Sequence, residues 1–220
     1  MMNKPLSKYK KKKIIGCFVL ELTATQTAKL LRINRKTINQ YYKRIRTAIA
    51  NYQEEQMKEF YGEIELDESY FGGRHKGNIG RSVKSKIPVF GILKRNGKVY
   101  TQIVPDASSR TLKSIVKDKV SKGSIIYSDS WKSYDGLVFD GYEHYRINHQ
   151  MEFVRNKRNH INGIESFWSY VKNKLSKFYG IKPEYFYLYL KEYEFRFNNR
   201  NKNLEQLIFE ILKRKKMLKC

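Results

Sequence analysis

Three acidic residues and a lysine occur in an order that could support phosphodiester chemistry. Asp67 ends a run in which apolar and acidic residues alternate, and Asp129 ends a short apolar run. Glu165 follows Asp129 after 35 intervening residues, and Lys172 comes seven residues later. Carboxylates are hard oxygen ligands of the kind that Mg²⁺ prefers. We therefore predict that Asp67, Asp129 and Glu165 bind a divalent metal.

The predicted chemistry is cleavage and transfer of a phosphodiester. Such a reaction needs a deprotonated oxygen nucleophile, in-line geometry and neutralisation of charge on the leaving oxygen, and a pair of metal ions supplies all three. Carboxylates held together without a metal repel one another and raise each other's pKa. The acid set therefore predicts Mg²⁺ as the cofactor, with Mn²⁺ as a substitute.

Each acid also has a structural interpretation. An aspartate at the end of a strand can simply form a turn, and Glu165 and Lys172 could be a surface pair. Glu63, Glu65 and Glu68 are interpreted as charges on a strand surface, and not as ligands. The order of the acids and their positions at strand ends favour the catalytic interpretation over these alternatives.

The elements around the first two acids predict an α/β domain. Alternation over residues 62–70 predicts a half-buried strand, with Ile64 and Leu66 on one side and the acids on the other. Apolar runs over 87–94 and 99–104 are joined by an Asn-Gly turn. A helix from Ser108 or Ser109 to residue 120 precedes a strand over 124–128. Three strands, a helix and a fourth strand are the order of a ribonuclease H-like fold, in which the first and fourth strands are neighbours.

The last acid lies on a helix with two distinct faces. Its apolar residues recur at steps of three and four and predict a stripe that packs on the sheet: Ile161, Ile164, Trp168, Val171 and Leu175. About 100 degrees around the helix runs a parallel polar stripe: Asn162, Glu165, Ser169, Lys172 and Ser176. Glu165 and Lys172 therefore share one face, two turns apart.

Residues 1–52 are predicted to form a small all-α helix-turn-helix domain that precedes the α/β domain. Thr25 is expected to cap a short helix, and Asn34 is expected to cap a second helix that begins at Arg35. The second helix has the side-chain types that contact base edges and phosphates, which predicts DNA contacts by Arg35, Lys36, Asn39, Gln40, Lys43 and Arg46. The more conservative interpretation is an ordinary basic surface helix. Residues 53–61 are expected to connect the two domains.

Charge and composition favour a nucleic-acid partner. Lys and Arg number 45 against 21 Asp and Glu, giving a formal charge of +24. The surplus is positive in each of the segments 1–60, 61–200 and 201–220, which favours an extended contact with nucleic acid over a single basic tail. Cys17 and Cys220 form no Cys-x-x-Cys pair, so neither a zinc ribbon nor a disulfide framework is expected. No run approaches the roughly 18 apolar residues of a membrane span, so we expect a cytoplasmic protein with no membrane partner.

Three motifs together resemble one known family. They are Asp67-Glu68-Ser69-Tyr70-Phe71-Gly72-Gly73, then Ser128-Asp129-Ser130-Trp131 with Tyr134, then His160-Ile161-Asn162-Gly163-Ile164-Glu165-Ser166-Phe167-Trp168 with Lys172. In this order they resemble the ISXO-like branch of bacterial insertion-sequence transposases of the DDE type, over roughly residues 62–200. The resemblance implies a ribonuclease H-like mixed sheet with flanking helices, dependence on magnesium, and transposition of an element bounded by terminal inverted repeats. It also implies a bacterial, nucleoid-associated location.

By position, the resemblance makes Asp67, Asp129 and Glu165 the metal ligands and brings Lys172 to DNA beside them. Asn162 lies one turn before Glu165 on the same stripe and is the alternative third ligand, or a DNA contact. We favour Glu165 because a carboxylate is the stronger metal ligand.

Four further residues are candidates for DNA contacts, each with a structural alternative. Trp131 could stack on a base or be a buried anchor, and His149 could serve the active site or form a loop hydrogen bond. Arg196 and Arg200 fall at helical spacing in an aromatic segment that is expected to close the core of a catalytic domain over 62–200. Residues 201–220 are expected to form a basic C-terminal helix.

The expected function is that of a DNA transposase that binds its terminal inverted repeats, cuts there and joins the freed ends to target DNA. Synapsis of two ends favours a homodimer or a higher homo-oligomer. The alternatives are a helix-turn-helix regulator or decayed transposase without catalysis, and a ribonuclease H-like nuclease that acts without an element.

Overall fold

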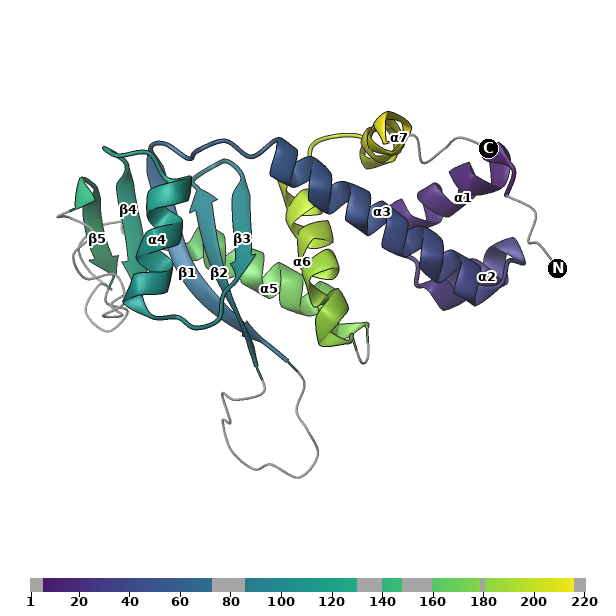
Figure 1. Ribbon diagram of the computed structural model, residues 1–220, viewed down its shortest axis with the longest axis horizontal. Helices are drawn as coiled ribbons and strands as arrows, with labels where there is room; N and C mark the ends of the chain where they lie inside the picture. The colour runs from purple at the N-terminus through teal and green to yellow at the C-terminus, as the bar shows by residue number, and fades with distance from the viewer. Residues whose placement is uncertain (1–5, 73–85, 130–139, 148–159, 179–180, 216–220) are drawn as a thin grey trace, which may run out of the picture. The chain divides into compact units, whose positions relative to one another are not determined.

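A computed structural model describes residues 6–72, 86–129, 140–147, 160–178 and 181–215 (Figure 1). The chain divides into two compact units. One unit contains residues 1–57 together with 191–220, and the other contains residues 58–190. This division differs from the expected domains, because the residues after 190 belong with the N-terminal helices, whereas we had placed 62–200 in one domain and 201–220 in a separate helix.

The unit of residues 58–190 is built on a five-stranded mixed sheet. Its strands are β1 (Glu63–Phe71), β2 (Ile87–Lys94), β3 (Val99–Ile103), β4 (Ile125–Asp129) and β5 (Glu143–Ile147). The strand order is β3-β2-β1-β4-β5. β2 lies antiparallel to β1 and β3, whereas β4 lies parallel to β1 and β5. This arrangement confirms the ribonuclease H-like fold and the predicted neighbourhood of the first and fourth strands. β5 was not predicted.

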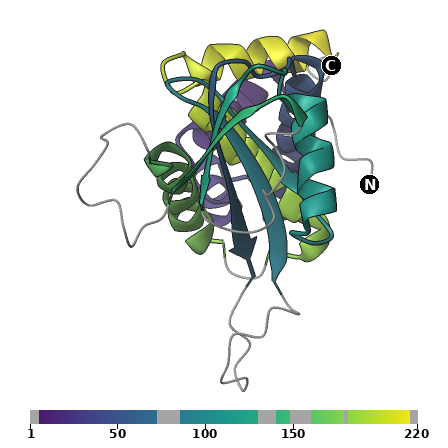
Figure 2. The same cartoon turned by 90° about the vertical axis from the view of Figure 1, so that its left-hand side faces the viewer.

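Helices cover both faces of the sheet. Figures 1 and 2 show α4 (Ser109–Lys119) on one face and α5 (Asn162–Ser176) on the other. Ser108 caps α4 as expected, because its side chain accepts a hydrogen bond from the Thr111 N–H. The expectation of a half-buried β1 is wrong near its start, since Ile64 is 0% exposed and the neighbouring Glu65 is only 1% exposed. Both faces of β1 are therefore covered.

The other unit is helical. It contains α1 (Lys8–Val19), α2 (Ala24–Leu31), α3 (Arg35–Glu55), α7 (Leu204–Arg214) and the second part of α6 (Pro183–Asn198). Its core joins the two ends of the chain: buried residues include Ile14, Phe18, Ile38, Ile45, Ile49, Phe195, Ile208 and Ile211. The helix-turn-helix is thus completed by C-terminal helices.

The caps of the helix-turn-helix agree with the sequence at one helix and differ at the other. Asn34 caps α3, since its side chain accepts a hydrogen bond from the Lys36 N–H at 2.7 Å. α2 is capped by Thr23, and not by Thr25, because Thr23 and Gln26 form a reciprocal capping box. This pairing of a threonine with a glutamine three residues later distinguishes the two threonines.

Candidate active site and nucleic-acid interface

The register of the parallel strands brings the two aspartates together. Leu66 of β1 is paired with Ser128 of β4, so Asp67 and Asp129 are the next residues along two neighbouring strands. On its other side Asp67 is paired with Gly91 of β2. Both aspartates are partly buried.

Gly91 allows α5 to lie close to the sheet at this point. A Cβ atom at residue 91 would lie 2.5 Å from Cζ2 of Trp168 and 2.9 Å from Cδ1 of Ile164, which is closer than carbon atoms approach. The apolar stripe of α5 is buried as predicted, with Ile164 and Val171 fully covered. Glu165 stands on the exposed polar stripe in the first turn of the helix. The helix therefore carries Glu165 toward the strand that holds Asp67.

Burial and the two neighbouring acids both raise the pKa of Asp67. The pKa of Asp67 is raised from 3.8 to about 7, mainly by burial and in addition by the negative charges of Asp129 and Glu165. The Glu68 backbone N–H donates to Asp67 at 2.8 Å and lowers this pKa. The indole N–H of Trp168 also lowers it, although this buried group makes no hydrogen bond of normal geometry within the described residues. The acids thus form an electrostatically coupled set in which attraction from a cation would be strong.

The chemistry of this donor set fits a hard divalent cation. Among the described residues, no three His, Cys, Asp or Glu side chains already converge in the geometry of a metal site. Mg²⁺ needs fewer protein ligands than that, because it keeps several waters and is commonly held by one or two carboxylates together with substrate phosphates. Asp67 and Asp129, on adjacent strands, are two carboxylates that could meet this requirement, and the charge of Glu165 on α5 also acts on Asp67.

Two of the remaining predicted site residues lie on the same helix face. Asn162 and Lys172 are both exposed on the polar stripe of α5. The Lys172 ammonium lies 5.8 Å from the centre of the Phe71 ring at the end of β1, which holds the cation near the strand that carries Asp67. Trp131 and His149 lie outside the described residues.

A polar cluster of Glu63, Glu65 and Arg95 was not predicted from the sequence. Glu65, which we had interpreted as a surface charge, is buried and accepts hydrogen bonds from Arg95 Nε at 3.0 Å and from the Ile164 N–H at 2.9 Å. Arg95 also donates to the His160 carbonyl at 2.5 Å and to Glu63 at 3.3 Å. The alternation in β1 could have indicated this cluster, because it places Glu65 on the same face of the strand as Asp67.

The N-terminal half of α3 presents the side chains expected to contact DNA. Five of the six are exposed: Arg35, Lys36, Asn39, Gln40 and Lys43. The expectation that Arg46 faces outward is wrong, because this residue is 6% exposed and its Nε donates to the Glu192 carboxylate at 2.7 Å. Arg46 therefore does not belong to the exposed face of α3.

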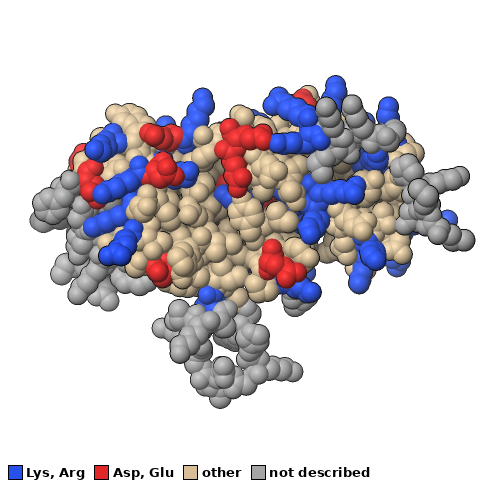
Figure 3. Space-filling view, viewed as in Figure 1, with Lys and Arg blue, Asp and Glu red and all other residues tan. Residues whose placement is uncertain are grey.

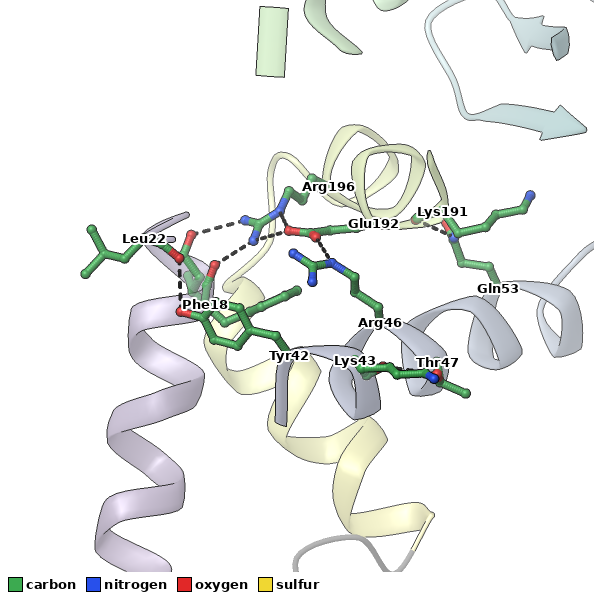
Figure 4. Close-up of polar contacts among 11 residues, drawn as sticks. Phe18, Leu22, Tyr42, Lys43, Arg46, Thr47, Gln53, Lys191, Glu192 and Arg196 are labelled. Carbon is green, nitrogen blue, oxygen red and sulfur yellow. Dashed lines mark hydrogen bonds and ion pairs between the residues drawn. The ribbon is translucent and has the colours of Figure 1, made fainter. Parts of the chain in front are cut away.

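Arg196 is likewise a buried residue, and not one offered to phosphate. Figure 4 shows Arg46 and Arg196 directed at the carboxylate of Glu192 from two helices. Arg196 also donates to the carbonyls of Phe18 and Val19, at 2.6 and 3.1 Å, at the end of α1. Its donors are therefore occupied inside the helical unit. Arg200 is exposed, stacks on the Phe197 ring and donates to the Phe197 carbonyl at 2.8 Å.

The basic surplus is visible on the surface of both units. In Figure 3, Lys and Arg side chains are scattered over the visible face, and acidic side chains occur in smaller groups among them. Within the described residues, no helix is long and apolar enough to cross a membrane. The charge distribution agrees with a multi-point contact with a polyanion.

Comparison with known proteins identifies the family. An uncharacterized transposase-like protein of Haemophilus influenzae is 51% identical over 102 residues, which cover 46% of this chain and 82% of the relative. Two solved structures of the Mos1 transposase, a pre-cleavage transpososome and a paired-end complex with Mn, align with 97% of this chain and 80% of theirs. Their sequence identities are 10% and 12% and their TM-scores 0.30 and 0.29, values too low to support a conclusion. The ISXO2-like transposase domain matches residues 59–198, and the chain belongs to this family of insertion-sequence transposases.

Proposed function

We propose that the protein is the transposase of an insertion sequence, which binds the terminal inverted repeats of its element, cleaves DNA there and transfers the freed strand to target DNA. The observation that carries the proposal is the strand register, which makes Asp67 and Asp129 the next residues along two adjacent strands; burial and the charges of Asp129 and Glu165 together raise the pKa of Asp67. Carboxylates held this close repel one another unless a cation is bound. A purely structural role for all three would leave that repulsion without compensation.

Each residue of the site has a part in the proposed reaction. Asp67, Asp129 and Glu165 hold the divalent metal, with Mg²⁺ as the physiological ion and Mn²⁺ as a substitute. The bound metal supplies a deprotonated oxygen nucleophile and neutralises charge on the leaving oxygen. Lys172 contacts a DNA phosphate beside the acids and orients the strand. Glu165 is favoured over Asn162 as the third ligand because its charge acts on Asp67.

DNA recognition is assigned to the exposed half of α3. Asn39 and Gln40 have the side-chain groups that pair with adenine edges, and Arg35 can pair with guanine in the major groove. Lys36 and Lys43 contact phosphates. Because transposition brings two ends together, the active form is a homodimer or a larger homo-oligomer.

The test is cleavage of a duplex that carries the terminal sequence of the element, with Mg²⁺ or with a chelator. Wild type is compared with Asp129→Asn, Glu165→Gln and Asn162→Ala, and with Glu184→Gln as a control on an exposed glutamate of α6. The proposal expects Mg²⁺-dependent cleavage at the end, abolished in the first two variants and retained in the control.

Two outcomes would replace the proposal. If all proteins retard the duplex in a gel but none cleaves it, the chain is a DNA-binding regulator or a decayed transposase. If cleavage depends on Mg²⁺ and Asp129 but is equal on unrelated duplexes, the chain is a ribonuclease H-like nuclease without an element.

A further inference from the structure

We infer that Glu65 and Arg95 are positioning residues, which hold the start of α5 against the sheet and thereby set the place of Glu165 relative to Asp67 and Asp129. The inference rests on the proposed function, because it concerns the same acid set. It assigns a role to a buried acid of β1 and to a residue of the β2–β3 turn.

The first turn of α5 is capped from the sheet and not from its own sequence. Ile161 occupies the N-cap position and has no side chain that can accept a hydrogen bond. Helices leave their first N–H groups without partners within the helix. Oε2 of Glu65 accepts from the Ile164 N–H at 2.9 Å, and a negative charge at this end of a helix is also favoured by the helix dipole. The carboxylate of Glu65 therefore takes the place of an N-cap.

Arg95 fixes the Glu65 carboxylate and binds the segment that leads into α5. Its Nε donates to Oε1 of Glu65 at 3.0 Å, and its Nη2 donates to the carbonyl of His160 at 2.5 Å. The guanidinium lies 3.6 Å from the centre of the Tyr127 ring, and the Tyr127 hydroxyl donates to Glu63 at 2.9 Å. One side chain thus connects β1, β4 and the start of α5.

The positions of these contacts explain their effect on the acids. Glu65 comes two residues before Asp67 on β1, and Tyr127 comes two residues before Asp129 on β4. In a strand, residues two apart share a face and lie about 7 Å from each other. Ile164, which receives the cap, immediately precedes Glu165. The polar cluster therefore contacts all three acid-bearing elements, two residues from Asp67 and Asp129 and one residue from Glu165.

Gly163 shows how closely α5 and Glu65 approach. A Cβ atom at this position would lie 2.8 Å from Oε2 of Glu65 and 3.1 Å from Cδ2 of Leu93. Since Glu65 is 1% exposed and both its oxygens accept hydrogen bonds, it has little room to retreat. The same contacts make Glu65 a support of the metal site and not a ligand in it.

The test measures Mn²⁺ binding to the full chain by electron paramagnetic resonance, without DNA. Glu65→Ala removes the cap, whereas Glu65→Gln retains an oxygen that can accept from the Ile164 N–H but places an amide donor against Arg95 Nε. Gly163→Ala displaces Glu65 without removing a hydrogen-bonding group. Val116→Ala is the matched control, because it loosens the core under α4, a helix on the other face of the sheet. Asp129→Asn defines loss of the site itself.

We expect Glu65→Ala and Gly163→Ala to weaken Mn²⁺ binding by about 10- to 100-fold, the range typical of residues that orient metal ligands. Glu65→Gln should recover part of the affinity, because its amide oxygen can still accept from the Ile164 N–H, and Val116→Ala should bind like wild type. Recovery by Glu65→Gln would not follow from general loosening of the fold. If Glu65→Ala does not fold, Gly163→Ala gives the same comparison.

The results separate the two proposals. If Asp129→Asn loses Mn²⁺ but Glu65→Ala and Gly163→Ala bind it like wild type, the positioning role is wrong and the proposed function stands. The positioning role is also wrong if Val116→Ala weakens binding as much as they do. If Asp129→Asn binds Mn²⁺ like wild type, the metal site and the positioning role are both wrong.

Discussion

Replacing Asp67 by asparagine should stabilise the metal-free protein at neutral and alkaline pH. The folded state raises the pKa of Asp67 from 3.8 to about 7, so the folded chain holds this proton more tightly than the unfolded chain does. Stability therefore falls as the pH rises from about 4 to about 7, and the whole penalty is present above pH 7. A pKa difference of about 3, at about 1.4 kcal/mol for each pKa unit, corresponds to about 4 kcal/mol.

Asn at position 67 keeps an oxygen that can accept from the Glu68 N–H, a contact of 2.8 Å in the wild type, so the substitution removes charge with little change of shape. The assay is urea unfolding at pH 5, 6, 7 and 8 in the presence of a chelator. Tryptophan fluorescence reports on the correct unit, because both tryptophans, Trp131 and Trp168, lie within residues 58–190. Asp140→Asn, which removes an acid paired with Lys117, is the control.

The free energy of unfolding of wild type should decrease between pH 5 and pH 8, and most of that decrease should be absent in Asp67→Asn. At pH 8 the variant should be more stable by up to about 4 kcal/mol. Addition of Mg²⁺ should stabilise wild type more than the variant, because metal compensates the same repulsion. An equal pH dependence in wild type and Asp67→Asn would show that the folded state does not raise the pKa of Asp67 as described.

Three further predictions concern other parts of the molecule. Glu192→Ala leaves Arg46 and Arg196 as buried charges without this partner, and should reduce the free energy of unfolding by about 3–5 kcal/mol in thermal unfolding followed by circular dichroism. The control, Glu210→Ala at an exposed position, should change it by less than about 0.5 kcal/mol. Equal effects of the two substitutions would contradict the buried pairing. Gly91→Ala should cost about 1–3 kcal/mol in urea unfolding, because the new methyl group meets Trp168; wild-type stability would show that α5 can retreat. Lys36→Ala should make the plot of log binding constant against log salt concentration less steep by about 0.9 for any duplex. An unchanged slope would show that Lys36 does not contact a phosphate.

The fold was predictable where a pattern is local. The alternation in β1, the Asn-Gly turn after β2 and the stripes of α5 each follow from side-chain spacing, and the structure contains each of them. β5 escaped prediction because Glu143–Ile147 mixes charged and apolar residues without a clear period. The pairing of the first and fourth strands was predictable only through the order of the elements.

The side chains of long-range contacts were not predictable in the same way. A basic residue on the polar side of a helix is normally solvated, and helical spacing alone placed Arg46 and Arg196 outside. Their burial depends on Glu192, which is 146 residues from Arg46 in sequence, and on the return of the C-terminal helices. Glu65 was misplaced for a related reason, since the helix that covers it begins 97 residues later.

The packing of α7 against α1 and α3 has a consequence for the order of events during synthesis. Ile208, Ile211 and Leu212 complete the core around Ile14 and Ile38, so the ribosome must release the chain as far as Leu212 before the helical unit can bury its apolar surface. We expect a nascent chain that ends at residue 57 to bind DNA poorly, although the whole recognition helix is already present. DNA binding would then be acquired only by molecules in which residues 58–190 have already been made, and fragments from interrupted translation would not compete for the element ends.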